Sequence, residues 1–103
     1  MKESIKFYSI DEFEIKIYYS NKVMKFLKLN HILSENTLDG LMIKSVKRIN
    51  GKSIRVDLKE LHGKLQGLFR VRKGDIRIIF QYIKGEIHIV NIETIAYRGD
   101  VYK

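Results

Sequence analysis

The sequence of 103 residues contains no cysteine and no proline. Without cysteine the chain has no disulfide, no thiol nucleophile and no thiolate ligand for zinc. No apolar run approaches the roughly 18 residues that a membrane helix needs. Glu3 and Lys6 also interrupt the N-terminus, where a targeting segment would lie. We therefore expect a cytoplasmic protein without a membrane partner.

The chain also lacks internal repeats, low-complexity tracts and linker-like stretches. Hydrophobic residues make up 45% and charged residues 31%, as in ordinary folded proteins. A chain of this length buries one modest core. We expect residues 1–103 to form a single domain.

What the sequence has in excess is positive charge, a formal net of +8 at pH 7. Residues 21–51 carry six basic and two acidic side chains, a net of +4. Residues 52–77 carry eight basic and three acidic ones, a net of +5. Such a basic region indicates an anionic partner, either nucleic acid or an acidic protein segment. The alternative is a lysine-rich surface that only keeps the protein in solution.

Hydrophobic periodicity in the first half predicts strands followed by two helices. Residues 13–20 alternate with a period of two, which is typical of a half-buried strand. The preceding stretch SIKFYSI allows an additional short N-terminal strand. Ser20 or Asn21 is expected to cap the first helix. A second is expected from about Thr37 to Ile49, where Asn50-Gly51 ends it.

The second half predicts an antiparallel meander of three strands joined by tight turns. The expected strands are Leu68–Lys73, Ile76–Ile83 and Glu86–Ile95. Before them, KSIRVDLKELHGK is expected to be an extended or irregular connector anchored by Leu58 and Leu61. The expected fold is therefore α+β, with both helices packed on one face of a four-stranded, mainly antiparallel sheet. The other face would be partly open.

The stretch LFRVRKGDIRIIF places three arginines on one predicted hairpin. Arg70 and Arg72 are two residues apart in a strand, so they share a face. The predicted hairpin brings Arg77 of the next strand close to them. Three neighbouring cations repel one another unless an anion is present. Phosphate fits this role, because the guanidinium fork matches its oxygens. The alternative is neutralisation within the protein by Asp57, Glu60 or Asp75.

The chain ends in AYRGDVYK, which adds aromatic and basic side chains after the last predicted strand. Tyrosines stack on bases and arginine holds phosphate, so this ending suits a nucleic-acid site. The alternative is a tail whose tyrosines pack on the edge of the sheet.

Three stretches together resemble the RelE/ParE toxin superfamily of bacterial and archaeal toxin–antitoxin modules. They are FEIKIYYSNKVMKFLKL, ELHGKLQGLFRVRKGDIRIIF and AYRGDVYK, which span residues 13 to 102. The resemblance implies a microbial RNase fold and a ligand face on the sheet. It also implies a cognate acidic antitoxin, with which the toxin forms a hetero-oligomer. Some members cleave mRNA on the ribosome without a metal or other cofactor, and others inhibit DNA gyrase.

The resemblance also implies roles for individual residues. Arg77 matches the arginine that stabilises the scissile phosphate, and Tyr102 matches the C-terminal tyrosine. The expected catalytic residues are Arg77, Tyr97, Arg98 and Tyr102. The expected RNA-binding residues are Lys59, Lys64, Arg70, Arg72 and Lys73.

Two positions depart from the family pattern. Tyr97 stands where many nuclease members have histidine, and Ala96 stands where one well-known type has a catalytic arginine. A free tyrosine has a pKa near ~10, but neighbouring arginines lower it, so Tyr102 is expected to act as the base or as a stacking platform. The histidines match no family motif and have no metal-ligand spacing; they are His31, His62 and His88.

The expected function is therefore a toxin that inhibits translation as a ribosome-dependent mRNA endoribonuclease. The first alternative is a gyrase inhibitor without nuclease activity. The second is a decayed toxin that only binds its antitoxin.

Overall fold

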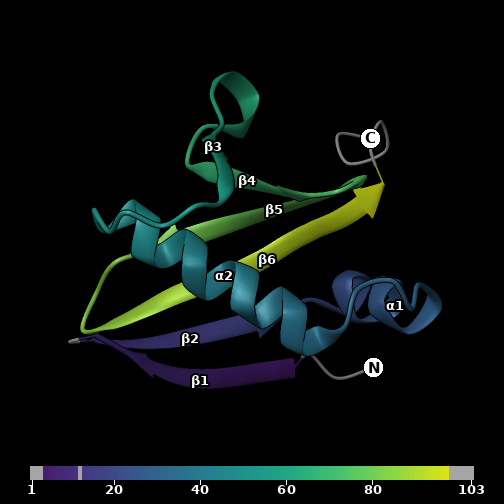
Figure 1. The fold of residues 1–103 in the computed structure, drawn as a ribbon, viewed down its shortest axis with the longest axis horizontal. Coiled ribbons are helices and arrows are strands. Elements are labelled where there is room, and N and C mark those ends of the chain that lie inside the picture. Colours follow the sequence, from purple (N-terminus) through teal and green to yellow (C-terminus); the bar gives the residue numbers. More distant parts are fainter. Residues whose placement is uncertain (1–3, 12, 98–103) are drawn as a thin grey trace.

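The computed structural model describes residues 4–11 and 13–97 (Figure 1). Within these residues, neither helix has the length and apolar character to cross a membrane. The elements are, in chain order, β1 (Ser4–Ile10), β2 (Phe13–Tyr19), α1 (Asn21–Leu29), α2 (Glu35–Ile49), β3 (Asp57–Glu60), the 3-10 turn η1 (Gly63–Leu65), β4 (Leu68–Lys73), β5 (Ile76–Ile83) and β6 (Ile87–Tyr97).

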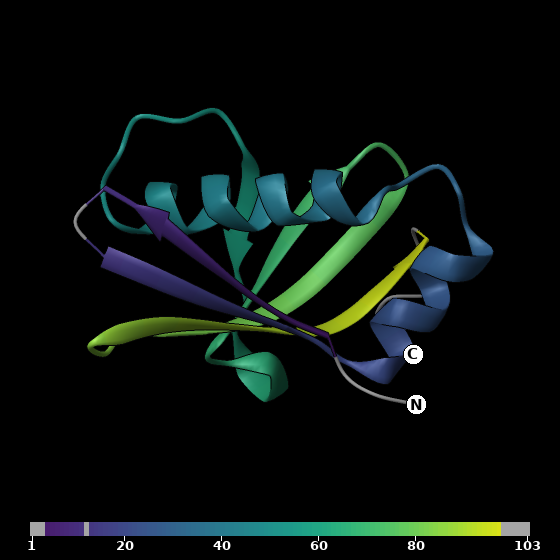
Figure 2. The same cartoon turned by 90° about the horizontal axis from the view of Figure 1, so that it is seen from below.

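All six strands belong to one mixed sheet with the order β1-β2-β6-β5-β4-β3. β2 and β6 are parallel, and the other neighbouring strands are antiparallel. α2 lies across one face of this sheet, whereas η1 lies on the other side (Figure 2). We call the face opposite α2 the open face.

The expected architecture is wrong in detail, although the class is α+β. The sheet has six strands rather than four, because SIKFYSI pairs along its whole length with β2 and because residues 57–60 pair with β4. It is mixed rather than mainly antiparallel, because β6 returns beside β2 in the same direction. The helices do not share a face. α2 covers the sheet, while α1 lies beside the carboxyl end of β6 (Figures 1 and 2).

The start of α1 and the end of α2 follow the predicted capping signals, whereas the cap at the start of α2 was not predicted. The Ser20 hydroxyl accepts a hydrogen bond from the backbone N–H of Val23, which caps α1. The Ser34 hydroxyl caps α2 in the same way and places its start two residues before the expected Thr37. Asn50 caps the other end of α2, and Gly51 follows with a φ of 91°, a conformation that favours glycine.

The main core lies between α2 and the sheet. Leu38, Met42 and Val46 recur every four residues, so they lie on one stripe of α2, and all three are fully buried. Alternate residues of the strands meet this stripe, as the period of two requires. They include Ile15, Ile17, Val71, Ile78, Phe80, Val90 and Ile92.

A second, smaller core lies on the open face. Leu61 and Ile79 are buried there, and Leu65, Leu68 and Ala96 pack against them. The segment between β3 and β4 therefore covers part of the open face. Leu61 anchors that segment on the open face and Leu58 anchors it to the main core, as predicted for both.

Candidate nucleic-acid interface

The three hairpin arginines lie on the open face, and we call them the arginine surface. Val71, Ile76 and Ile78 alternate with them and point into the main core. Arg72 and Arg77 are direct partners in the β4–β5 register, so their side chains leave the sheet next to each other. Arg70 lies two residues before Arg72 on β4, so its side chain is on the same face. The fold therefore gathers three guanidinium groups on a face that α2 does not cover.

One carboxylate serves two of these arginines. Asp57 of β3 lies directly across from Arg72, and its Oδ2 forms an ion pair with the Arg72 Nε. Its Oδ1 accepts a hydrogen bond from Arg70 at 3.0 Å. Asp57 is thus one of the three carboxylates proposed from the sequence to neutralise the arginines within the protein. Its single negative charge offsets only one of the three positive charges.

Arg77 has a different environment. Its Nη1 donates to the backbone carbonyl of Gly74 at 3.0 Å, and no carboxylate of the described residues lies within ion-pair distance. Three cations and one anion leave the cluster of Arg70, Arg72, Arg77 and Asp57 with a net charge of +2. Such an excess attracts a polyanion.

The Arg70 side chain is more enclosed than that of Arg72, which is 49% exposed. The side chain of Arg70 is 16% exposed, and among the described residues its buried Nε has no hydrogen-bond partner. A buried donor without an acceptor is unfavourable by about 1–3 kcal/mol. An incoming phosphate that draws the guanidinium outward would relieve this cost.

The three predicted RNA-binding lysines lie at different places around the arginine surface. Lys59 of β3 is the cross-strand partner of Arg70 and is exposed on the same face. Lys64 is exposed on η1, which crosses the open face. Lys73 ends β4, and by the alternation of that strand it lies on the α2 side. Lys59 and Lys64 therefore extend the positive surface, and Lys73 does not.

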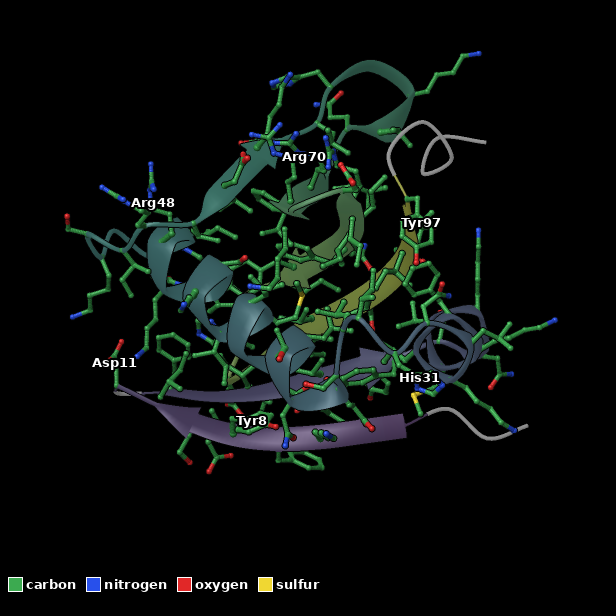
Figure 3. The ribbon with its side chains drawn as sticks, turned by 45° about the vertical axis from the view of Figure 1, so that its right-hand side comes forward. Tyr8, Asp11, His31, Arg48, Arg70 and Tyr97 are labelled. Carbon is green, nitrogen blue, oxygen red and sulfur yellow. The ribbon has the colours of Figure 1, made fainter. Side chains whose placement is uncertain are left out.

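The C-terminal part of β6 contributes no charge next to Arg77. Ala96 is the cross-strand partner of Arg77. Tyr97 points away from the arginines, since its hydroxyl donates to Asn30 Oδ1 at 2.8 Å and its ring packs on Phe26 (Figure 3). In the described part of the chain, Arg77 thus has no proton-transferring partner across either neighbouring strand. Arg98 and Tyr102, the remaining predicted catalytic residues, lie outside the described residues.

His88 belongs to a packed cluster at the other end of the β5–β6 hairpin. Its ring stacks on Phe13 with centroids 4.0 Å apart, and its Nδ1 is hydrogen-bonded to the Tyr82 hydroxyl. Burial, with a contribution from Lys84, lowers the pKa of His88, and burial raises the pKa of Tyr82. No group of three or more potential metal-binding side chains occurs among residues 4–11 and 13–97.

A second group of side chains on the open face was not predicted from the sequence. We call it the aromatic surface. It comprises Ile5 and Phe7 of β1 and Lys16 and Tyr18 of β2. Phe7 is 62% exposed and Ile5 is 45% exposed. The Lys16 ammonium lies 5.4 Å from the Phe7 ring centroid and 4.9 Å from that of Tyr18. The stretch SIKFYSI has apolar residues at both odd and even positions. Its pattern therefore does not predict which of the two sets is exposed, and in the structure the odd positions are.

A cavity of about 800 Å³ lies away from both surfaces, beside α1 and the turn that follows it. Apolar side chains line it, including Met24, Leu27 and Leu33, and Lys25 and Lys28 stand beside them. This combination suits an acidic segment with apolar anchors better than a phosphate chain.

Comparison with protein families, with characterised proteins and with solved structures finds no match to this chain. The resemblance to RelE/ParE toxins therefore stays a prediction. The residue pattern and the geometry of the open face are the two sources of evidence for the function of this chain.

Proposed function

We propose that this chain is the toxin of a type II toxin–antitoxin module and acts as a metal-independent mRNA endoribonuclease on the ribosome. The observation that supports this most is the pairing of Arg72 with Arg77 across β4 and β5, on a face that α2 leaves uncovered. Among the described residues, one carboxylate pairs with this group of three arginines, so a net positive charge remains to bind phosphate. The resemblance of residues 60–80 to RelE-like members supplies the type of phosphate chemistry.

RNA cleavage of this kind needs a base for the 2′-hydroxyl, positive charge at the pentacoordinate phosphate, and an acid for the leaving 5′-oxygen. We assign the positive charge to Arg77, because no described carboxylate competes for it. Arg70 and Arg72 hold the neighbouring phosphates.

The base that takes the 2′-hydroxyl proton is assigned to Tyr102, whose phenolate form a neighbouring cation such as Arg98 would favour. The leaving 5′-oxygen then takes its proton from water. Of the two predicted tyrosines, Tyr97 is the weaker choice, because its hydroxyl is directed to Asn30 on the side of α1. Its contact with Phe26 instead holds α1 against the end of β6.

The proposal is tested by adding the protein to a translation extract and mapping the 5′ ends of the mRNA. Arg77→Ala should lower the cleavage rate by about 100-fold or more, because it removes the charge that stabilises the transition state. Arg55→Ala is a matched control, since Arg55 is an exposed arginine in the segment before β3. Undiminished cleavage by both Arg77→Ala and Tyr102→Phe would remove this site from consideration.

The second candidate is a gyrase inhibitor that cuts no RNA. It is favoured by one observation, namely that Ala96 faces Arg77 at the place where a family nuclease has an arginine. A supercoiling assay run beside the cleavage assay separates the two activities. Inhibition of supercoiling without new mRNA ends would establish the gyrase inhibitor. Activity in neither assay would leave a protein that only binds its antitoxin.

The partner in the proposed module is an acidic antitoxin that is partly disordered until it binds. α1 carries three lysines and no acidic residue, and two of these lysines stand beside the apolar cavity. Apolar anchors in the cavity and carboxylates on the lysines fit such a segment, and the complex should weaken with salt. A pull-down from the host that recovers no small acidic protein would contradict it.

A further inference from the structure

We infer that the aromatic surface binds the bases of the same RNA strand whose phosphates the arginine surface holds. The inference rests on the proposed function, because it takes RNA as the ligand. It adds a second binding site, about two strands away on the same face, with Phe7 and Tyr18 as stacking rings and Lys16 as the phosphate contact between them.

The local geometry suits single-stranded nucleic acid. In the β1–β2 register Phe7 is the partner of Lys16, and Ile5 is the partner of Tyr18, so the two rings lie diagonally with the ammonium between them. Exposed aromatic rings on a sheet stack on unpaired bases, and a cation next to them holds the backbone.

Both surfaces belong to one face of one sheet. Tyr18 pairs with Asn91 of β6, and Ala96 of the same strand pairs with Arg77. With about 3.3 Å per residue along a strand and about 4.8 Å between strands, Tyr18 and Arg77 are roughly 20 Å apart. A strand of about four to six nucleotides reaches from one to the other, which is a typical length for a single-stranded site.

Between the two sites, β5 is covered and β6 carries polar side chains on the open face. Leu61 and Leu65 pack on Ile79 of β5, so the segment carrying η1 covers that strand. Thr94 and Asn91 of β6 lie beside it on the open face, and both are partly exposed. The RNA would therefore pass over β6, where hydrogen-bonding side chains face the bases.

The charges around the aromatic surface constrain how the strand lies. Glu93 lines a small depression with Tyr18 and Asn91, so a phosphate is disfavoured there and a base edge fits better. Glu14 lies on the other side of Lys16 along β2. Phosphates are thus directed to Lys16. An acidic protein segment would be repelled by the carboxylates of Glu14 and Glu93. A mainly apolar protein partner would have to bury the charged Lys16 at the centre of its contact. RNA therefore fits this surface best.

The test is fluorescence anisotropy with a labelled eight-nucleotide oligouridylate. Phe7→Leu removes the ring but keeps an apolar side chain, and it should weaken binding about tenfold, the loss of one stacked base. Phe7→Tyr keeps the ring and should retain the native affinity. Leu29→Ala is the control for an exposed apolar residue elsewhere, because Leu29 is 68% exposed on α1.

A second probe, an abasic ribose-phosphate strand of the same length, isolates stacking from charge. Native protein and Phe7→Leu should bind it equally, because it offers phosphates and no bases. Unchanged affinity of Phe7→Leu for the oligouridylate would overturn the inference. Equal losses on both strands would also overturn it, since the ring would then act through the fold.

The two proposals fail in different ways. If Arg77→Ala weakens oligouridylate binding and abolishes mRNA cleavage while Phe7→Leu binds like the native protein, the aromatic site is wrong and the proposed function stands. If Phe7→Leu weakens binding but the native protein produces no new mRNA ends in the translation extract, the aromatic site stands and the proposed nuclease fails.

Discussion

The two outer strands of the sheet are each held by one aspartate, and the two aspartates differ in burial. On β1, the Lys6 ammonium lies 2.9 Å from Asp39 Oδ2 of α2, and the Tyr8 hydroxyl donates to the same oxygen. The Asp39 side chain is only 4% exposed. This contact joins the strand to the helix across the edge of the main core.

On β3, at the other end of the sheet, Asp57 binds Arg70 and Arg72 of the neighbouring strand, and its side chain is 39% exposed. Figure 3 shows Tyr8 and Arg70 at these opposite ends of the sheet. A buried ion pair that loses one partner is strongly destabilised, whereas an exposed pair contributes little to folding. The comparison therefore assigns Asp39 to stability and Asp57 to the charge balance of the arginine surface.

The largest expected effect is that of Asp39→Ala. It leaves Tyr8 without its acceptor and Lys6 with Glu35 alone, which lies 3.2 Å away. Loss of a buried ion-pair partner costs about 3–5 kcal/mol in general. We expect about 2–4 kcal/mol here, because Lys6 keeps Glu35 and because Asp39 Oδ1 is buried without a hydrogen-bond partner among the described residues.

Urea denaturation followed by circular dichroism measures this loss, and hydrogen exchange should show that β1 opens first. Asp57→Ala is the comparison variant. If the two substitutions lower the free energy of unfolding equally, the distinction between a stabilising and a functional aspartate is wrong.

Alkaline pH should weaken the β1 contact and leave the β3 contact intact. Burial alone would lower the pKa of Lys6, but hydrogen bonds to Asp39 and Glu35 outweigh it, and the pKa is raised above 10.5. Burial and the hydrogen bond to Asp39 raise the pKa of Tyr8 above 10.0. Both groups thus stay protonated longer in the folded state. Their stabilisation is complete below pH ~10 and is lost as the pH rises through the folded values.

Arg70 and Arg72 of β4, which bind Asp57 of β3, stay charged throughout this range. The free energy of unfolding of the native protein should therefore be lower at pH 11 than at pH 8. For Tyr8→Phe the difference between the two pH values should be smaller. Tyr18→Phe is the matched control, because it removes a tyrosine from the open face. A Tyr8→Phe variant with the native alkaline loss would exclude Tyr8 as a source of the effect.

Much of the fold followed from local patterns. The alternation of β2, the Ser20 cap, the buried stripe of α2 and the meander were all predicted within a few residues. β3 was missed because three of its four residues are exposed, so it lacks an apolar alternation. The pairing of β2 with β6 joins distant segments, and no local pattern predicts such a partner.

For the candidate site, too, local patterns predicted some features and not others. The shared face of Arg70 and Arg72 follows from the strand period alone. Their common bond to Asp57 required β3 to pair with β4, and this pairing was not visible in the sequence. The aromatic surface depends on β1, whose exposed positions are as apolar as its inward ones. Local periodicity therefore predicts which residues share a strand face, but not which strands become neighbours.

The smallest effect on stability, and the most direct test of the comparison, is expected for Asp57→Ala. An exposed ion pair contributes about 0–1 kcal/mol, so the free energy of unfolding should hardly change. Affinity for the oligouridylate should rise, because Arg70 and Arg72 lose their competing carboxylate. The slope of log affinity against log salt should steepen by about 0.7 for each additional phosphate that the arginines bind.

Asp75→Ala is the matched control for this variant. It changes the net charge by the same amount at the neighbouring exposed turn, and Asp75 forms no ion pair with the described arginines. A general charge effect would raise the affinity of both variants alike. A rise confined to Asp57→Ala would show that this carboxylate occupies the place where the arginine surface receives phosphate, because only there does its removal free two guanidinium groups.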